Sequence, residues 1–168
     1  KVSAVAGYAE GEFIVQDPAT ALAVSLLEIA PGETVLDACA APGGKTVQLA
    51  WRGAQVTACE VNPKRRRRLE ETLARMRLSE KVAVISSLPA SAPGAFSKLL
   101  VDAPCSNTGV FRRRPDARWN WSGEKLATLV KLQAEILDIC APLVAVGGRL
   151  VYSTCSNEPE ENDEQVEG

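Results

Sequence analysis

The sequence contains no histidine among its 168 residues. This absence excludes Ser-His-Asp and Cys-His catalysis, histidine-ligated zinc and proton transfer through an imidazole of this chain. Any acid, base or nucleophile that the protein uses must therefore be Asp, Glu, Lys, Cys, Ser or Tyr.

Paired cysteine motifs and long apolar runs are also missing. The five cysteines occupy positions 39, 59, 105, 140 and 155, and no two form a C-x-x-C pair. This spacing excludes a zinc ribbon and a thioredoxin-type redox motif, and we predict no metal site. An odd number of cysteines without a signal-peptide pattern predicts reduced thiols in a cytoplasmic protein. No apolar run is long enough to span a membrane, so we expect no membrane partner.

Charge is distributed unevenly along the chain, although the formal net charge is only -2. Residues 157–168 carry six acidic side chains and no basic one. Arginines and lysines gather at residues 64–68 and again at residues 112–118. We interpret the first cluster as a solvated helix face, because two glutamates follow it. The second lies in a loop with proline and aromatic residues, which favours binding of a polyanion.

Apolar runs of strand length alternate with helical periodicity along the chain. We expect strands at residues 34–37, 55–59, 82–85, 98–101 and 149–153. We expect helices from Asp17-Pro18 to Pro31-Gly32, at 44–51, at 62–78, and at 124–143 with Gly147-Gly148 closing the last. The pattern predicts one α/β domain over residues 1–168, with a mostly parallel twisted sheet and helices on both faces. The Ser-, Pro- and Ala-rich stretch at residues 86–95 is expected to be a surface loop.

Reactive and polar side chains follow the expected strands. Ligands of open parallel sheets bind beyond the carboxyl ends of the strands. We therefore expect one rim to gather Asp37, Cys39, Glu60, Ser87, Asp102, Cys105, Thr154 and Cys155.

Residues 37–46, DACAAPGGKT, nearly match a phosphate-binding P-loop. Cys39 replaces the first glycine of that motif, and its side chain would crowd the phosphates. Glu60, at the end of the second strand, is placed to accept hydrogen bonds from ribose hydroxyls. We favour a nucleoside cofactor, while a P-loop-like ATPase and a plain strand-to-helix turn remain alternatives.

Three segments together resemble a known family. Residues 37–46, residues 102–119 (DAPCSNTGVFRRRPDARW) and residues 152–162 (YSTCSNEPEEN) are similar to motifs of the RNA cytosine-5 methyltransferases of the Sun and nucleolar-protein type. The arginine-containing segment is most similar to bacterial enzymes that act on small-subunit ribosomal RNA. The resemblance implies a class I, Rossmann-like methyltransferase fold, S-adenosylmethionine as donor, and a cytosine in RNA as acceptor.

The resemblance also implies catalytic roles. Cys155 would be the nucleophile that adds to carbon 6 of cytosine, and Cys105 would assist breakdown of the adduct. Asp102 would bind or protonate ring nitrogen 3. Lys45 would either lower the pKa of a nearby thiol or hold Asp102 in place, and the sequence leaves both open.

Binding roles follow in the same way. The donor would be held by Cys39, Ala40, Ala41, Pro42, Gly43, Gly44, Lys45, Glu60 and Asp102. The RNA phosphates would be contacted by Arg112, Arg113, Arg114 and Arg118. Trp119 and Trp121 would either stack on unpaired bases or anchor the loop to the core.

The chain departs from the family pattern at several points. Asn107 stands where the family usually has glycine, and Ser86-Ser87 stand where it commonly has an aspartate. Two further strands of the class I fold and an N-terminal RNA-binding domain are not apparent. We expect a monomeric catalytic core from a longer protein, and a catalytically silent RNA-binding core remains a third alternative.

Overall fold

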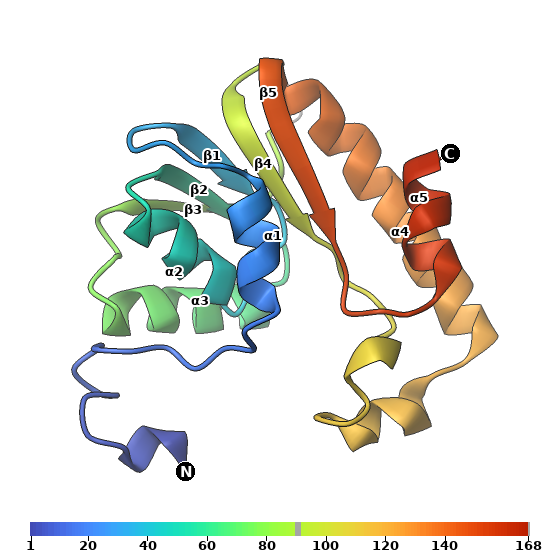
Figure 1. Ribbon diagram of the computed structural model, residues 1–168, viewed down its shortest axis with the longest axis horizontal. Coiled ribbons are helices and arrows are strands. Elements are labelled where there is room, and N and C mark those ends of the chain that lie inside the picture. Colours follow the sequence, from blue (N-terminus) through green and yellow to red (C-terminus); the bar gives the residue numbers. More distant parts are fainter. Residues whose placement is uncertain (90–91, 168) are drawn as a thin grey trace.

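A central parallel sheet organises the computed structural model, which describes residues 1–89 and 92–167 (Figure 1). The described strands follow the order β3-β2-β1-β4-β5, and every neighbouring pair is parallel. Their bounds are β1 Thr34–Asp37, β2 Gln55–Cys59, β3 Val82–Ile85, β4 Phe96–Asp102 and β5 Val144–Ser153. The α-helices are α1 Thr20–Leu26, α2 Gly44–Trp51, α3 Pro63–Arg75, α4 Gly123–Cys140 and α5 Asp163–Glu167. Short 3-10 turns are η1 Val2–Ala4, η2 Thr108–Val110, η3 Pro115–Asn120, η4 Ala141–Leu143 and η5 Pro159–Glu161.

Helices cover both faces of the sheet, as the sequence predicts. Successive side chains of a strand point to opposite faces. In β4, Leu100 therefore joins a core formed with α1, α2 and α3, whereas Leu99 and Val101 join a second core on the α4 side. Figure 1 shows α4 apart from the other three helices. The expected α/β architecture is confirmed.

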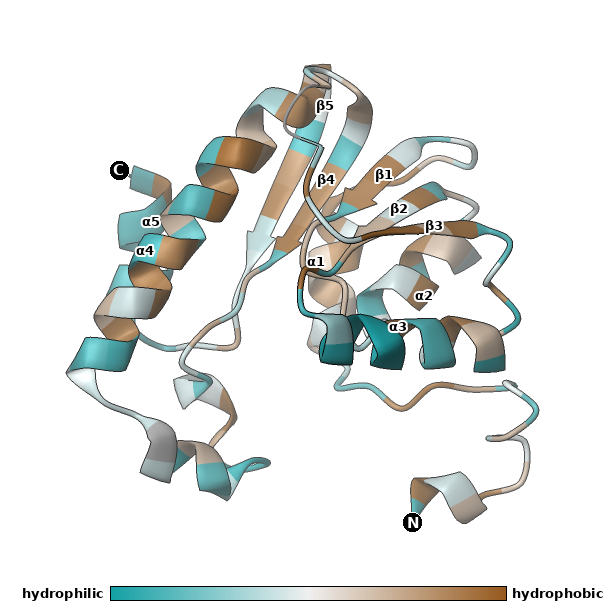
Figure 2. Cartoon of the chain, turned by 180° about the vertical axis from the view of Figure 1, so that it is seen from behind, coloured by the Kyte–Doolittle hydropathy of each residue, from teal (hydrophilic) through white to brown (hydrophobic). Residues whose placement is uncertain are grey.

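Helix α3 begins where its sequence indicates. The Asn62 side chain accepts hydrogen bonds from the backbone N–H groups of Lys64 and Arg65, and Pro63 is the first helical residue. Leu69 and Leu73 are buried, while Figure 2 shows hydrophilic residues over much of the helix surface. The interpretation of residues 64–68 as a mainly solvated face is confirmed.

The first long helix is shorter than expected. Asp17 does not cap it directly; its carboxylate accepts the Ala19 N–H, and regular α-helix begins at Thr20. The helix ends at Leu26, well before Pro31. Glu28 adopts a left-handed conformation with φ of 49°, which ends the right-handed helix.

The expected helix at residues 124–143 and its glycine terminator are corrected in the same region. Helix α4 stops at Cys140, because Pro142 has no N–H to continue the hydrogen-bond ladder. Gly147 and Gly148 lie instead inside β5, at an irregularity in its pairing with β4. A Cβ at Gly148 would lie 2.7 Å from the Ser97 carbonyl oxygen, so close approach of the two strands requires glycine there.

Two other sequence expectations are answered here. The expected loop at residues 86–95 includes residues 90 and 91, which lie outside the described residues, and its described part contains neither helix nor strand. Among the described residues, β5 is followed by η5 and α5 and by no further strand. No helix in the described part of the chain has the length and apolarity needed to cross a membrane.

Candidate active site

A cavity of about 780 Å³ opens at the carboxyl ends of β1, β4 and β5. Its volume lies within the usual range for small-molecule sites. Among the residues predicted for the rim, it is lined by Cys39, Asp102, Cys105, Thr154 and Cys155. Asp37, Glu60 and Ser87 do not line it.

The turn between β1 and α2 is held mainly by backbone hydrogen bonds. The N–H of Ala40 donates to the Cys59 carbonyl at 2.9 Å, and that of Gly43 donates to the Ala40 carbonyl at 2.7 Å. Gly43 has φ of 106°, a conformation that glycine adopts without a steric penalty. Burial raises the pKa of Cys39 far above its ordinary value, so this residue stays a thiol. The turn therefore presents backbone rather than reactive side chains.

Asp37 lies beneath this turn and is buried, which corrects its expected place on the rim. The Thr46 hydroxyl donates to Asp37 Oδ2 at 2.7 Å, and Asp37 Oδ1 has no hydrogen-bond partner. Burial raises the pKa of Asp37 to about 7, against the opposing effect of the Thr46 hydrogen bond. This carboxyl group supports the turn from below.

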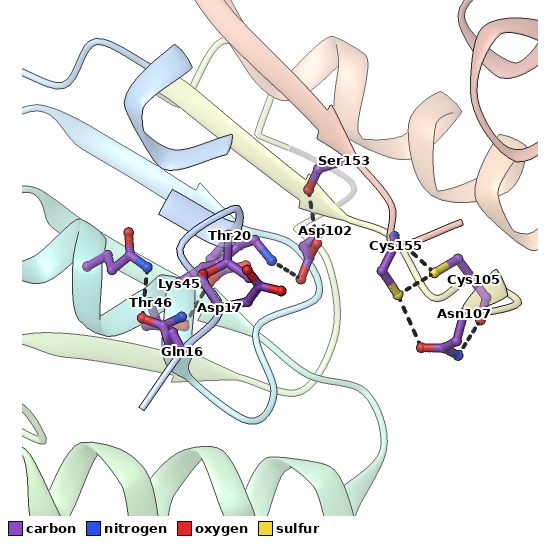
Figure 3. A network of polar contacts seen from close by, with 12 residues as sticks. Gln16, Asp17, Thr20, Lys45, Thr46, Asp102, Cys105, Asn107, Ser153 and Cys155 are labelled. Atoms are coloured by element: carbon purple, nitrogen blue, oxygen red, sulfur yellow. Dashed lines mark hydrogen bonds and ion pairs between the residues drawn. The ribbon is translucent and has the colours of Figure 1, made fainter. Parts of the chain in front are cut away.

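Lys45 and Asp102 form an ion pair inside the cavity (Figure 3). Lys45 Nζ lies 2.6 Å from Asp102 Oδ2, and the Ser153 hydroxyl donates to Asp102 Oδ1 at 2.9 Å. The Asp102 carboxylate is thus fixed from two elements, α2 and β5. Of the two alternatives for Lys45, this geometry favours holding Asp102 in place.

Two thiols meet beside this ion pair. Cys105 Sγ and Cys155 Sγ are 3.1 Å apart, and the Cys155 N–H donates to Cys105 Sγ at 3.3 Å. The Asn107 side chain bridges them, because its Oδ1 lies 3.1 Å from Cys155 Sγ and its Nδ2 donates to the Cys105 carbonyl at 2.9 Å (Figure 3). Residues from two neighbouring strands therefore form one cluster.

The thiols share a proton. Donation from the Cys155 thiol lowers the pKa of Cys105 to about 7, against the opposing effect of burial. The same hydrogen bond, together with burial, raises the pKa of Cys155. The two thiols are in contact and titrate as a unit, so the first proton is lost from the pair rather than from one named residue.

Asn107 replaces the usual glycine without disturbing the backbone. Its φ of 63° lies in the left-handed region, which asparagine occupies more readily than other side-chain-bearing residues. Glycine adopts this conformation readily, and the asparagine adds side-chain contacts to the Cys155 thiol and the Cys105 carbonyl.

Glu60 directly follows the last residue of β2, as predicted, and its carboxylate points toward the start of α3. Oε1 accepts the Asn62 N–H at 2.9 Å, and Oε2 lies 3.1 Å from the Arg65 guanidinium. Arg65 itself lines the cavity. Each carboxylate oxygen has a second lone pair, so Glu60 retains capacity to accept another hydrogen bond.

Only some arginines of the loop at residues 112–118 are available to bind a polyanion, because two of them have partners within the protein. Arg113 forms an ion pair with Asp17 of the N-terminal segment, and the Arg118 guanidinium lies 5.6 Å from the Phe111 ring centre. Arg112 and Arg114 are exposed, and Arg114 lines the cavity together with Arg113.

The tryptophans beside this loop do not belong to the core. Trp119 is 89% exposed and Trp121 is 46% exposed. Trp119 therefore does not anchor the loop to the core, whereas Trp121 is partly covered and lines a hollow with Leu126 and Leu129 of α4. Their rings are accessible at the edge of the loop, as stacking on unpaired bases requires.

Sequence reasoning missed one buried charge near the thiols. Glu161 is fully buried and accepts hydrogen bonds from Ser106 and Gln133, although it lies in the acidic run at residues 157–168. No local pattern separates it from Glu160. Across residues 1–89 and 92–167, no group of three or more His, Cys, Asp or Glu side chains is placed to hold a metal ion.

Comparison with known proteins identifies the family. A family model described as 16S rRNA methyltransferase RsmB/F matches residues 24–168. Ribosomal RNA small subunit methyltransferase B of Pseudomonas syringae pv. tomato is 43% identical over 172 residues, which cover 99% of this chain and 38% of that protein. The Cronobacter sakazakii protein of the same name is 44% identical over 170 residues, which cover 98% of this chain and 40% of that protein. The chain thus spans about two fifths of the length of these relatives.

Solved structures agree with this assignment. PH0851 superposes with a TM-score of 0.93 at 35% identity, covering 99% of this chain and 39% of that chain. NSun6 from Pyrococcus horikoshii, solved with SFG, superposes with a TM-score of 0.87 at 26% identity, covering 99% of this chain and 44% of that chain. A SAM-dependent O-methyltransferase from Thermotoga maritima superposes with a TM-score of 0.64 at 17% identity, covering 92% of this chain and 49% of that chain, which is a likeness of fold alone. The predicted class I methyltransferase fold is confirmed, and the chain belongs to the 16S rRNA methyltransferase RsmB/F family.

Proposed function

We propose that this protein transfers a methyl group from S-adenosylmethionine to carbon 5 of a cytosine in ribosomal RNA, through a covalent adduct with Cys155. The observation that carries the proposal is the contact of 3.1 Å between Cys105 and Cys155 in a cavity that also contains the Lys45–Asp102 pair. Family membership supports the donor and the class of RNA.

The donor site suits S-adenosylmethionine. One cavity reaches both Cys39 and Ala41 of the β1–α2 turn and the two thiols. The turn from Cys39 to Gly44, together with Lys45 and Asp102, would hold the donor, and the free lone pairs of Glu60 would accept ribose hydroxyls. When bound there, S-adenosylmethionine supplies an electrophilic methyl group.

The acceptor chemistry requires a sulfur nucleophile. Carbon 5 of cytosine is a weak nucleophile until a thiolate adds to carbon 6 and makes the ring an enamine. Cys155 is assigned this addition by its family motif. The pair first loses one proton, so that when the Cys155 sulfur adds to carbon 6 the remaining proton stays on Cys105 Sγ, 3.1 Å away. After methyl transfer a base removes the hydrogen of carbon 5, and the electrons of that bond expel Cys155 as a thiolate. Cys105 lies beside the bond that breaks and must release its own proton to solvent before it can act as this base.

Asp102 serves the cytosine ring. Its carboxylate is oriented by Lys45 and Ser153 in the same cavity as the thiols. An ionised carboxylate can only accept hydrogen bonds, so Asp102 would first take up a proton, from the Lys45 ammonium or from water, and then donate it to ring nitrogen 3. That donation withdraws electrons from carbon 6 and favours addition of sulfur. Lys45 therefore acts by keeping the carboxylate in position.

The RNA substrate must present an unpaired or extruded cytosine, because stacking in a duplex shields carbons 5 and 6. Arg112 and Arg114 are exposed beside the cavity and suit phosphate contacts. Trp119 offers an exposed ring on which a neighbouring base can stack.

The proposal is tested by radiolabelled methyl transfer to ribosomal RNA, followed by mapping of the modified base. We expect Cys155→Ala to abolish transfer and Cys105→Ala to accumulate an RNA–protein adduct that survives denaturation. Cys140→Ala removes a buried thiol that does not line the cavity and should preserve turnover in the folded fraction. Normal turnover of the Cys105 variant without an adduct would contradict the two-cysteine mechanism.

The two alternatives from the sequence predict different results. A P-loop-like ATPase would bind ATP with Mg²⁺, whereas calorimetric titration should show binding of S-adenosylmethionine alone. The pairing of Lys45 with Asp102 argues against a phosphate-binding lysine. A silent RNA-binding core would bind RNA without incorporating methyl groups.

A further inference from the structure

Glu161 fixes the turn that carries Cys105. Its carboxylate accepts the Ser106 N–H at 2.9 Å and the Ser106 hydroxyl at 2.5 Å. Gln133 of α4 donates to the same carboxylate at 2.9 Å and also to the Pro104 carbonyl at 2.8 Å. Because Glu161 is fully buried, removal of the carboxylate would leave the Ser106 N–H without an acceptor, while Gln133 would keep only Pro104 and the Ser106 hydroxyl only its contacts with neighbouring hydroxyls.

Asn162, the next residue, fixes the turn that carries Cys155. Its Oδ1 accepts the Thr154 hydroxyl at 2.7 Å. Its Nδ2 donates to the carbonyls of Ser156 at 3.1 Å and Glu158 at 2.8 Å. The residues on both sides of Cys155 are therefore bonded to one amide.

These two anchors cannot move apart, because consecutive Cα atoms are about 3.8 Å apart along the chain. The pair is itself tied to the sheet, since the Tyr152 hydroxyl of β5 donates to the Glu161 carbonyl at 2.9 Å. The two cysteine turns also contact each other directly, with the Ser106 and Ser156 hydroxyl oxygens 3.0 Å apart.

We infer that Glu161 and Asn162 are positioning residues that set the contact between the two thiols, Glu161 through the Cys105 turn and Asn162 through the Cys155 turn. The thiols follow different strands, β4 and β5, and the backbone pairing of these two strands ends before it reaches either cysteine. A shift of either turn by about 1 Å would separate two sulfurs that are in hydrogen-bond contact. The catalytic consequence of this inference rests on the proposed function, but the thiol contact does not.

Isosteric substitutions test the inference. Glu161→Gln removes the negative charge and one acceptor oxygen, and Asn162→Asp removes the amide donor. Glu164→Gln is the matched control, because Glu164 is exposed on α5. The rate of alkylation by iodoacetamide is measured against pH, and the modified cysteine is identified by peptide mass spectrometry. This readout needs neither RNA nor methyl donor.

The direction in which the midpoint pH of alkylation moves distinguishes a positioning role of Glu161 from a purely electrostatic effect of its charge. In the native protein we expect alkylation at the pair to rise with a midpoint near pH 7, where the Cys155 hydrogen bond places the pKa of Cys105. The charged groups near the pair are Lys45 and Asp102 in the cavity and Glu161 beneath the Cys105 turn. The charge of Glu161 raises the pKa of Cys105, so its neutralisation without movement would lower the midpoint.

Loss of the thiol contact has the opposite effect. We expect Glu161→Gln to move the midpoint upward toward the ordinary cysteine value of about 8.5, with alkylation at pH 7 about threefold slower after allowance for nucleophilicity. Asn162→Asp should also raise the midpoint, but its added negative charge raises a thiol pKa even without movement, so Glu161→Gln is the deciding variant. Glu164→Gln should leave the midpoint unchanged. An unchanged or lowered midpoint in folded Glu161→Gln would overturn the inference.

A milder variant covers the case in which Glu161→Gln does not fold. Ser106→Ala removes only the hydroxyl bond and leaves the carboxylate in place, so a smaller upward shift is expected, and no shift would count against the inference. With RNA and donor present, Glu161→Gln should accumulate adduct, whereas Asn162→Asp should slow its formation. Absence of any adduct in the native protein would defeat the proposed function while leaving the alkylation result intact.

Discussion

The two sides of the cavity are built differently. The β1–α2 turn is fixed by backbone hydrogen bonds to neighbouring strands, including Ala38 N–H to the Leu100 carbonyl at 2.9 Å. The two cysteine turns are fixed largely by side chains, above all by Glu161 and Asn162. A backbone-built turn depends on conformation and burial, whereas a turn held by side chains depends on their chemical identity.

This comparison separates two kinds of mutational effect. Substitutions under or within the β1–α2 turn should change the free energy of unfolding. Substitutions of exposed or cavity-lining side chains, including Lys45 and Arg112, should instead change catalysis or RNA binding at nearly constant stability. Each of the following experiments tests one half of that division.

Asp37→Asn should give the largest change, in the pH dependence of stability. The pKa of Asp37 is about 7 in the folded protein and 3.8 in its ordinary state, so the folded state binds an extra proton between these values. The free energy of unfolding therefore falls as pH rises through this window, by on the order of 4 kcal/mol. Asparagine cannot ionise, and this decline should disappear.

Urea unfolding at several pH values measures this effect. Asp163→Asn, at an exposed position of α5, is the control and should retain the native pH dependence. If Asp37→Asn shows the native decline between pH 4 and 7, then another group is responsible for it.

Lys45→Met should act mainly on catalysis. It removes the ammonium group 2.6 Å from Asp102 and leaves that carboxylate with Ser153 as its remaining hydrogen-bond partner. We expect the turnover rate to fall roughly a hundredfold, the low end of losses in general acid–base catalysis. Steady-state kinetics with RNA and donor check this, and Lys64→Met, exposed on α3, is the control. Unchanged turnover would show that Asp102 needs no orienting partner.

Gly43→Ala should act on stability. At φ of 106° an alanine is strained, and its Cβ would lie 3.0 Å from Leu69 Cδ1. We expect a loss of about 1–3 kcal/mol in the free energy of unfolding. Gly123→Ala is the matched control, because nothing lies within 4 Å of its added Cβ. Equal midpoints of urea unfolding for the two variants would refute the strain argument.

Arg112→Ala should give the smallest effect. If this exposed arginine contacts one phosphate of a single-stranded segment, the slope of log affinity against log salt should fall by about 0.7. Binding titrations at several salt concentrations measure the slope. Arg52→Ala, at the end of α2 remote from Gly44, should leave it unchanged.

Much of the fold could be predicted because its signals are local. The strands at residues 34–37, 55–59 and 82–85 have their predicted bounds, and Asn62-Pro63 begins a helix as expected. The end of α4 could not be placed from periodicity, because Pro142 interrupts an apolar pattern that continues into β5. Strand and helix periods are hard to separate over such a short apolar run.

The sequence by itself determined the parallel α/β order, the convergence of Cys105 and Cys155 on one rim, and the absence of imidazole chemistry. Only the tertiary structure decided that Lys45 pairs with Asp102, that the Cys105 and Cys155 thiols are in contact, and that Glu161 is buried. The physical reason is that the alternation of strands and helices along the chain follows from local periodicity, whereas the partner of a side chain and its burial depend on groups far away in the chain. Helix α4 and strand β5 separate Ser106 from Glu161 along the chain, and no spacing in the sequence predicts that these two residues hydrogen-bond.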